Sequence, residues 1–385
     1  MKKIYLDNNA TTPLDSRVLE VMLPHIRENY GNPSSIHSLG RSAKAALDKA
    51  REQTAGLVSA TPKEIVFTSG GSESNNYAIK GAAFTLREKG KNHLIATSVE
   101  HESVLFTFEY LESEGFSVTY LGVDGRGIID LDELSDSITD ETALVSCMYA
   151  NNETGAVMPV REISEIVKNR GVVFHTDAVQ AAGKLEIDLD AIRADLMSLS
   201  AHKLYGPKGT GALFVRDGAA GDLLLKTLIH GGGQERGRRS GTENIAGIAG
   251  LGEASEIAAG DLSRDRERVK PLRDLLYESI SKEIKGVKLN ADLQNTLWNT
   301  LNLSFLGVRG ESLAMNLDLD GIAVSTGSAC SEGKVDPSHV LRAMGVSKDD
   351  AASSVRFSLG RFTNREDIDY VLGKLPGIVE RIRSV

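Results

Sequence analysis

Two charged residues follow apolar runs of the sequence, where a charged side chain is unexpected. Lys203 comes soon after the run Leu196–Ser200, and Asp177 comes directly after the run Val172–Thr176. Partial burial would lower the pKa of the Lys203 amine and free it for attack on a carbonyl group. The alternative is a lysine whose stem packs while its ammonium reaches water. An unpaired buried carboxylate is costly, so Asp177 either caps a helix or holds a cation.

A third feature is the glycine-containing turn Ser69–Ser74, which follows the run Glu64–Thr68 and opens a helical stretch. Bare backbone N–H groups at the start of a helix suit a phosphate group. A plain strand-to-helix turn with Ser72 as its cap is the alternative. The turn alone therefore leaves both hypotheses open.

The two cysteines occupy different kinds of sequence. Cys330 lies in the segment Ser325–Lys334, whose small residues suit an accessible thiol on a mobile loop, although a tight turn is the alternative. Cys147 lies in the apolar run Ala143–Ala150 and is expected in the core. Cys330 has no second cysteine or histidine nearby with ligand spacing, so we expect no metal site. We also expect no disulfide between these two environments.

Seven short β-rich runs alternate with helical stretches between residues 64 and 216. Several are nearly continuous in apolar residues, as expected of strands buried on both faces. The alternation predicts an α/β fold with a mostly parallel, seven-stranded sheet and helices on both faces. The expected strands are Glu64–Thr68, His93–Thr97, Ser117–Gly122, Leu144–Tyr149, Val172–Thr176, Leu196–Ser200 and Ala212–Arg216.

Five polar motifs follow the ends of these expected strands. In open α/β sheets, ligands bind beyond the carboxyl ends of the strands. One of the motifs contains His101, which by itself is typical of a hydrogen-bonded loop histidine. Together they predict a single site at one edge of the sheet. The motifs are Ser69–Ser74, Glu100–Glu102, Asn151–Glu153, Asp177–Gln180 and Ala201–Lys203.

The pattern changes after about Leu262. A charged helical stretch, Ser263–Lys285, leads into alternating segments that predict a second, α+β domain. One of these segments is Ser354–Leu359, in which alternate apolar residues share one strand face and Arg356 lies on the other. Arg356 could therefore point into a polar cleft, where its guanidinium would suit a substrate carboxylate. A salt bridge between domains is the alternative.

Composition narrows the class of protein further. The 385 residues carry a formal net charge of −9. Nucleic-acid binding depends on neutralising phosphates with basic residues, so an acidic chain argues against it. The N-terminus reaches Asp7 without the apolar core of a signal peptide, and no apolar run approaches the length that spans a bilayer. Two thiols in so long a chain indicate a reducing setting, so we expect a cytoplasmic protein with no membrane or nucleic-acid partner.

Taken together, the motifs resemble those of the NifS/IscS-like cysteine desulfurases, which belong to the class V aminotransferases. The resemblance covers essentially the whole chain in order. It implies the fold of the fold-type I pyridoxal-phosphate enzymes, with a large cofactor-binding domain at 15–262. Residues 1–14 and 263–385 would form a small domain that carries the catalytic cysteine loop. The matching motifs are Tyr5–Pro13, Gly31–Ser35, Asp177–Gln180, Ser200–Lys203, Gly231–Arg236, Arg239–Thr242, Ser328–Cys330 and Ser354–Arg361.

The resemblance also implies a role for each site residue. Lys203 would bind the cofactor, pyridoxal 5'-phosphate, and later move the substrate's Cα proton, and Asp177 would pair with the protonated pyridine nitrogen. His101 would stack on the ring and handle protons. The remaining cofactor-binding residues would be Gln180 and Asn152 at the ring oxygen, Gly71, Ser72, Ser200 and His202 at the phosphate, and Thr242 at the phosphate of a neighbouring subunit. Arg356 and Asn152 would bind the substrate.

The implied reaction removes sulfur from L-cysteine, releases L-alanine and leaves a persulfide on Cys330. The sulfur would pass to an acceptor protein, expected to be an iron–sulfur scaffold, and the enzyme would be a homodimer. A selenocysteine lyase and an aminotransferase on the same fold are alternatives, although a transaminase has no need of Cys330. A non-enzymatic binding platform is another, although it would not need Lys203, Asp177 and His101 together.

Overall fold

The computed structural model describes residues 3–217, 225–326 and 337–384. At its centre is a seven-stranded sheet with the order β2-β8-β7-β6-β5-β3-β4. Neighbouring strands from β7 through β4 run parallel, whereas β8 is antiparallel to both β2 and β7. The strands are β2 (Ile65–Thr68), β3 (His93–Thr97), β4 (Ser117–Leu121), β5 (Thr142–Ser146), β6 (Val173–Asp177), β7 (Leu196–Ser200) and β8 (Gly211–Val215). The predicted mostly parallel, seven-stranded α/β fold is confirmed.

One expected strand differs from its prediction by more than a residue or two. The strand expected at Leu144–Tyr149 is β5, which runs from Thr142 to Ser146. Beyond it, the backbone N–H of Met148 donates to the carboxylate of Glu100 over 2.7 Å instead of to a neighbouring strand. This side-chain acceptor takes the place of a backbone carbonyl on one side of the strand, whereas on the other side Cys147 and Tyr149 still donate to His175 and Asp177 of β6.

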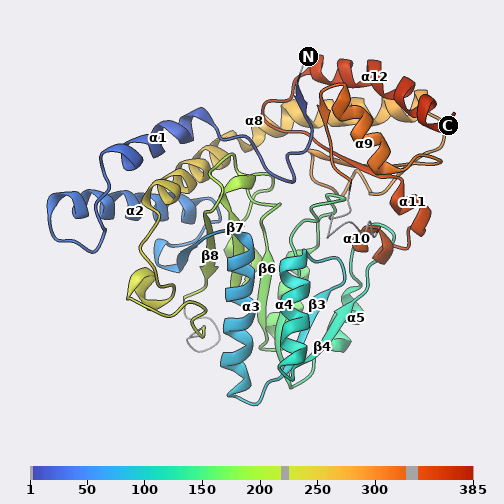
Figure 1. Ribbon diagram of the computed structural model, residues 1–385. Helices are drawn as coiled ribbons and strands as arrows, with labels where there is room; N and C mark the ends of the chain where they lie inside the picture. The colour runs from blue at the N-terminus through green and yellow to red at the C-terminus, as the bar shows by residue number, and fades with distance from the viewer. Residues whose placement is uncertain (1–2, 218–224, 327–336, 385) are drawn as a thin grey trace.

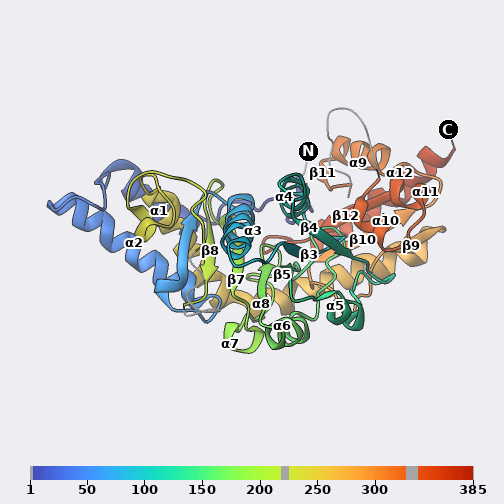
Figure 2. The same cartoon turned by 90° about the horizontal axis from the view of Figure 1, so that it is seen from below.

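Helices cover both faces of the sheet (Figures 1 and 2). Neighbouring strand residues alternate between the faces, so that Val173 and Leu196 pack in one cluster while Phe174 and Met197 pack in the other. The helices α3 (Gly71–Arg87) and α4 (Glu102–Ser113) cover the first face, and α6 (Val160–Asn169), α7 (Leu189–Ile192) and the first half of α8 (Ile245–Glu283) cover the second. The large part of the chain also holds α1 (Ser16–Arg27), α2 (Ser38–Gly56), α5 (Leu131–Ser137) and the 3₁₀ turns Pro62–Glu64, Ala201–Lys203 and Gln234–Gly237.

The C-terminal part has its own sheet and core. The antiparallel order is β12-β10-β9, and a parallel pair, β1 with β11, joins the N-terminal segment to this part. Its apolar residues form a separate cluster that includes Ile4, Leu6 and residues from 269 onward. The elements are β1 (Ile4–Tyr5), β9 (Val287–Leu289), β10 (Thr300–Phe305), β11 (Ile322–Ala323), β12 (Ser354–Ser358), α9 (Gly310–Leu319), α10 (His339–Ala343), α11 (Lys348–Ala352) and α12 (Arg365–Arg383).

The helix α8 connects the two parts, as Figure 1 shows along the top of the molecule. Its 39 residues contribute Leu251 to the core of the large sheet and Leu276 to the core of the small one. The stretch expected to be helical at Ser263–Lys285 is the second half of this helix, so the expected boundary at residue 262 lies inside a continuous element. The division into domains stays a prediction, and the composition of the two cores supports it.

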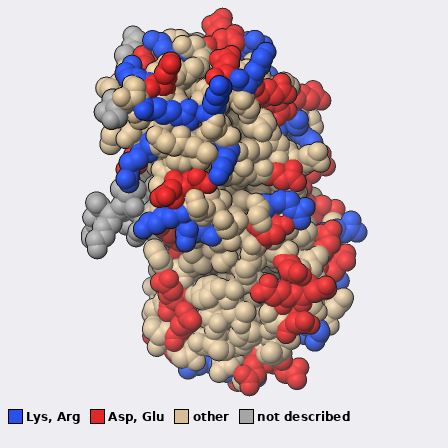
Figure 3. Space-filling model, turned by 90° about the vertical axis from the view of Figure 1, so that its right-hand side faces the viewer, with Lys and Arg blue, Asp and Glu red and all other residues tan. Residues whose placement is uncertain are grey.

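Charged residues are unevenly spread on the face in Figure 3. Basic and acidic side chains alternate over its upper part, whereas the charged residues of its lower part are mainly acidic. Within the described ranges, no helix combines the length and apolar character needed to cross a bilayer.

Candidate active site

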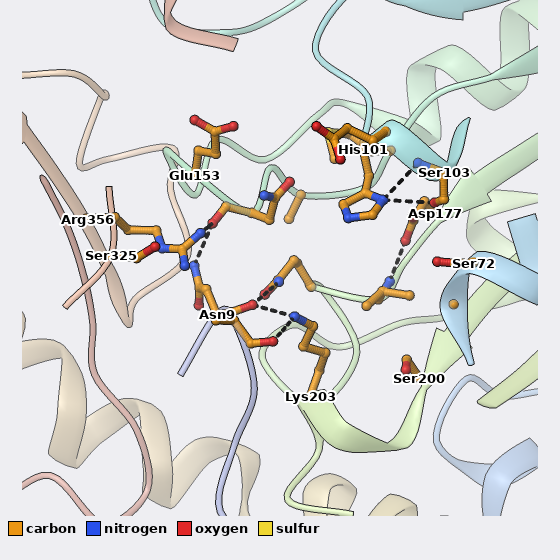
Figure 4. Close-up of a pocket in the computed structure, with 18 of the residues that line it drawn as sticks. Asn9, Ser72, His101, Ser103, Glu153, Asp177, Ser200, Lys203, Ser325 and Arg356 are labelled. Atoms are coloured by element: carbon orange, nitrogen blue, oxygen red, sulfur yellow. Dashed lines mark hydrogen bonds between the residues drawn. The ribbon is translucent and has the colours of Figure 1, made fainter. Parts of the chain in front are cut away.

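A cavity of about 540 Å³ lies where the carboxyl ends of β5, β6 and β7 face β12. Most of the residues singled out in the sequence line it. Those residues are Gly71, Ser72, His101, Asn152, Asp177, Gln180, Ser200, His202, Lys203 and Arg356. Figure 4 shows that their side chains enter from the sheet, from α3, from the start of α4 and from β12. The predicted meeting of the strand-end motifs at one edge of the sheet is therefore confirmed.

Lys203 ends the 3₁₀ turn that follows β7. Its Nζ donates to the backbone oxygens of Asn9 and Ala10, at 2.5 and 2.6 Å, so the N-terminal segment holds the amine in place. Burial lowers its pKa to about 8, and the nearby charge of Arg356 adds to this effect. At neutral pH a larger fraction of this amine is therefore uncharged than in a surface lysine, as expected of an amine that attacks a carbonyl group.

Asp177 is the last residue of β6 and is buried. Its Oδ2 accepts a hydrogen bond from Nδ2 of Asn75 over 2.7 Å, and its Oδ1 accepts one from the backbone N–H of Val179 over 2.9 Å. Neither donor is a cation, and no lysine or arginine of the described ranges forms a salt bridge with this carboxylate, which borders the cavity. The arrangement suits a cationic partner that the cavity would supply.

The start of α3 forms one wall of the cavity. Gly70 has φ of 155°, in the range that favours glycine, and is the N-cap without a side-chain hydrogen bond. A Cβ at Gly71 would stand 2.9 Å from Cγ2 of Val179, so the backbone approaches the neighbouring turn closely. The alternative in which Ser72 caps this helix is wrong, because Gly70 holds that position. The first amides of α3 and the hydroxyls of Ser72 and Ser200 border the same space, which suits a phosphate.

His202 and Gln180 line the cavity beside Lys203. The Nδ1 of His202 lies 3.2 Å from Oγ1 of Thr11. Burial, together with the charge of Lys203, lowers the pKa of His202 to about 4, so its ring is neutral at physiological pH. The amide of Gln180 donates through Nε2 to the backbone oxygen of Asn9 over 2.9 Å.

Arg356 lies on β12 and is buried at the other side of the cavity. Its Nη1 donates to the backbone oxygen of Asn152 over 2.9 Å, and its Nη2 pairs with Oδ1 of Asp7 over 2.7 Å. Its Nε is buried and has no hydrogen-bond partner within the described chain. Arg356 therefore makes a salt bridge, but to a residue of the same expected domain and not between domains, and the second N–H of each terminal nitrogen remains for an anion in the cavity.

His101 is the N-cap of α4, where its Nδ1 accepts the backbone N–H of Ser103 over 3.1 Å. The ring is thus hydrogen-bonded, as a loop histidine would be, and it also borders the cavity. Because Nδ1 accepts, the proton of the neutral ring is on Nε2.

Two described residues named in the sequence, Thr242 and Cys147, do not line this cavity. Thr242 is exposed and lies outside the lining. Cys330 lies outside the described residues. Cys147 is buried, as expected, and burial raises the pKa of its thiol.

The sequence reasoning missed several residues that line the cavity. Asn75 stands one helical turn after Gly71, a spacing that could have predicted it. Asn9 lies in the motif Tyr5–Pro13, which by itself suggests no role for it. Glu153, whose pKa is raised by burial, accepts a hydrogen bond from Ser338 over 2.5 Å. No local pattern could have predicted that pairing, because the two residues stand 185 positions apart.

Comparisons with known proteins agree with this geometry. The family model described as aminotransferase class-V matches residues 4–371. The cysteine desulfurase IscS of Clostridium botulinum is 48% identical over 386 residues, covering 100% of this chain and 96% of that protein. This chain is a member of the cysteine desulfurase family. The class V assignment and the NifS/IscS-like resemblance are thereby confirmed.

Solved structures place the chain in the same family. A structure titled as a NifS-like protein aligns with a TM-score of 0.92 at 42% identity, over 99% of this chain and 100% of that one. A structure titled SspA in complex with cysteine aligns with a TM-score of 0.82 at 39% identity, over 94% of this chain and 100% of that one. The fold of this desulfurase-family chain is therefore that of NifS-like proteins.

Proposed function

We propose that this chain is a pyridoxal-phosphate-dependent cysteine desulfurase that takes sulfur from L-cysteine and holds it as a persulfide on Cys330. The observation that carries the proposal is the arrangement in one cavity of an amine with a lowered pKa, Lys203, a buried carboxylate, Asp177, and a guanidinium, Arg356. An amine, a carboxylate and a guanidinium match the aldehyde, the pyridine nitrogen and the substrate carboxylate that this chemistry requires.

The lining residues fit the proposed cofactor. The start of α3, with Ser72 and Ser200, would hold its phosphate, and His202 would assist there as a neutral donor. Asp177 would pair with the ring nitrogen, and Gln180 and Asn152 would bind the ring oxygen. When bound, pyridoxal phosphate would supply an electron sink for negative charge that develops at the substrate's Cα.

Lys203 would be both the covalent attachment point of the cofactor and the group that moves the Cα proton. With a pKa of about 8, roughly a tenth of such amines are neutral at pH 7, far more than for an ordinary lysine. The two backbone oxygens that accept from its Nζ keep the amine directed to one place. Arg356 would orient the substrate by binding its carboxylate.

Sulfur would move from the substrate to Cys330 as one bond forms and another breaks. The thiolate of Cys330 forms a bond to the substrate sulfur, and the Cβ–Sγ bond breaks with its electron pair going to carbon. That carbon takes a proton and becomes the methyl group of alanine, while Cys330 keeps the sulfur as a persulfide. His101 stands at the cavity wall as the candidate proton carrier.

We propose a homodimer in which Thr242 reaches the partner's phosphate site. Large apolar side chains are exposed on and between α1 and α2, among them Ile26 at 58%, Tyr30 at 76% and Ile36 at 91%. Exposed apolar surface of this kind supports burial against another chain. In Figure 1 this region lies at the opposite end of the molecule from α9 and α12. The sulfur acceptor, an iron–sulfur scaffold protein, and a cytoplasmic location belong to the same proposal.

The test combines an absorption spectrum with mass spectrometry. Purified protein supplied with pyridoxal phosphate should show a visible absorption band, and incubation with L-cysteine should yield alanine and one added sulfur on the peptide that contains Cys330. Alanine without added sulfur on any peptide would contradict the persulfide. Comparison with selenocysteine under the same conditions separates a desulfurase from a selenocysteine lyase, and formation of a keto acid would identify an aminotransferase.

A further inference from the structure

Lys184 is a buried lysine behind the cavity. It ends the tight turn that follows β6, where the backbone N–H of Lys184 donates to the oxygen of Ala181 over 2.9 Å. The preceding Gly183 has φ of +69°, and a Cβ there would stand 2.7 Å from Cδ2 of Leu204, so the turn packs tightly against the following segment. Only 7% of Lys184 is exposed. Lysines are almost never buried to this extent without a polar role.

Among the described residues, the amine of Lys184 hydrogen-bonds only to Gln180, at two of its oxygens. Its Nζ donates to the backbone oxygen of Gln180 over 3.0 Å and lies 3.4 Å from the side-chain Oε1. On its other side, the same amide donates through Nε2 to the backbone oxygen of Asn9 over 2.9 Å. That oxygen also accepts from Nζ of Lys203.

These contacts determine which way the Gln180 amide faces. A lysine ammonium only donates, so the atom beside Lys184 must be Oε1. A backbone carbonyl only accepts, so the atom beside Asn9 must be Nε2. The second N–H of Nε2 is left for an acceptor in the cavity that Gln180 lines. A flipped amide would place two donors together at Lys184 and two acceptors together at Asn9.

We propose that Lys184 is a positioning residue that fixes the amide of Gln180 so that it presents a donor to the ring oxygen of the cofactor. The inference rests on the proposed function, since it requires pyridoxal phosphate in the cavity. Lys184 touches neither the cofactor nor the substrate and acts only through Gln180. A lysine that merely filled space could be replaced by an apolar residue, because burial of an unneeded ammonium destabilises the fold.

The electrostatics of the turn agree with this role. Burial and, to a smaller extent, the charge of Lys203 lower the pKa of Lys184 to about 7. In its protonated form the amine can only donate to Gln180, whereas a neutral amine could also accept, so the protonated form of Lys184 is the one that fixes the amide.

A double-mutant cycle tests the proposal through the affinity for pyridoxal phosphate, measured by equilibrium titration of the cofactor-free protein. Lys184→Met should weaken binding about tenfold in the native background, the effect of losing one well-oriented hydrogen bond. In the Gln180→Ala background the same substitution should change the affinity less than twofold. Thermal unfolding of each variant measures any change in stability separately.

Two further variants sharpen the test. Lys168→Met removes a lysine that pairs with the buried Asp195 away from the cavity, and it should lower stability while leaving cofactor affinity unchanged. If Lys184→Met does not fold, Lys184→Gln replaces it in the same affinity measurement. Its amide can donate or accept, so it no longer dictates the orientation of Gln180 and should also weaken binding.

Equal losses of affinity in both backgrounds, or full affinity in Lys184→Met, would overturn the inference. A native chain that binds no pyridoxal phosphate would instead contradict the proposed function, and the inference with it.

Discussion

Arg356 and Asp7 form an ion pair at the cavity wall, with Nη2 2.7 Å from Oδ1, although they stand 349 positions apart in the sequence. The pair joins β12 to the N-terminal segment that also holds the amine of Lys203. It orients the guanidinium and leaves the buried Nε without a partner in the described chain. An anion in the cavity would therefore meet a guanidinium whose position is already fixed.

Arg356→Lys should raise KM for L-cysteine at least tenfold and change kcat less. A lysine cannot keep contacts with Asp7 and Asn152 and also bind a carboxylate, because it lacks the planar fork of the guanidinium. Steady-state kinetics of alanine formation measures both constants. Arg342→Lys, an exposed arginine on α10, is the matched control and should behave as the native enzyme. An unchanged KM in Arg356→Lys would show that the carboxylate binds elsewhere.

Lys203→Ala should abolish covalent attachment of the cofactor. Reduction with borohydride followed by peptide mapping should place pyridoxal phosphate on Lys203 in the native protein and on no lysine in the variant. Lys208→Ala, an exposed lysine five positions along the chain, should retain the label. Label on another lysine of the native protein would make the assignment wrong.

Cys330→Ser should bind pyridoxal phosphate and still change its absorption spectrum when L-cysteine is added, but it should form no persulfide. Serine lacks the thiolate that attacks the substrate sulfur. Mass spectrometry of the intact protein, with assay of released sulfide, is the measurement. Cys147→Ser is the control, because Cys147 is buried and its thiol pKa is raised, so sulfur transfer should persist there with at most a loss of stability. Full desulfurase activity in Cys330→Ser would contradict the mechanism.

Thr242→Ala should weaken retention of the cofactor in a protein that light scattering identifies as a dimer. Thr242 is exposed and does not line the cavity of its own chain, so we expect it to contact cofactor phosphate in the site of another subunit. Dilution should release cofactor in parallel with dissociation of the dimer. A monomer that retains its cofactor would refute the shared site.

His175 should make the fold sensitive to acid. It lies on β6 with Nδ1 2.8 Å from Oγ of Ser146 and Nε2 3.0 Å from Oγ of Ser198, and burial lowers its pKa to about 3. The folded protein keeps the ring neutral, whereas the unfolded chain protonates it near its ordinary pKa of about 6.5. Its contribution to stability is therefore complete above about pH 6.5 and is lost as the pH falls toward 3, with about 2 kcal/mol lost by pH 5.

Urea unfolding at pH 7.5 and at pH 5 measures this loss. The native protein should lose about 2 kcal/mol more of its unfolding free energy over this interval than His175→Gln does. His230→Gln, at an exposed position, should lose as much as the native protein. Identical pH dependence in the native protein and in His175→Gln would exclude His175 as the cause.

Local sequence was sufficient to predict the sheet and much of its chemistry. Strands such as β3 and β7 are short apolar runs with clear ends, and their observed bounds match those expected. Because parallel strands bring their carboxyl ends to one edge, the residues that follow them had to meet there. Lys203, Asp177 and His101 could be assigned to one site for that reason, and the family motifs gave them roles.

The tertiary structure alone decided the contacts between distant segments. The ion pair of Asp7 with Arg356 and the hydrogen bond from Lys203 to Asn9 join residues far apart in the sequence, and no periodicity encodes such pairs. The burial that lowers the pKa of Lys184 arises only when its turn packs against Leu204 and the neighbouring helix. Sequence pattern thus fixes which groups face the site, whereas packing fixes their partners, their burial and hence their protonation.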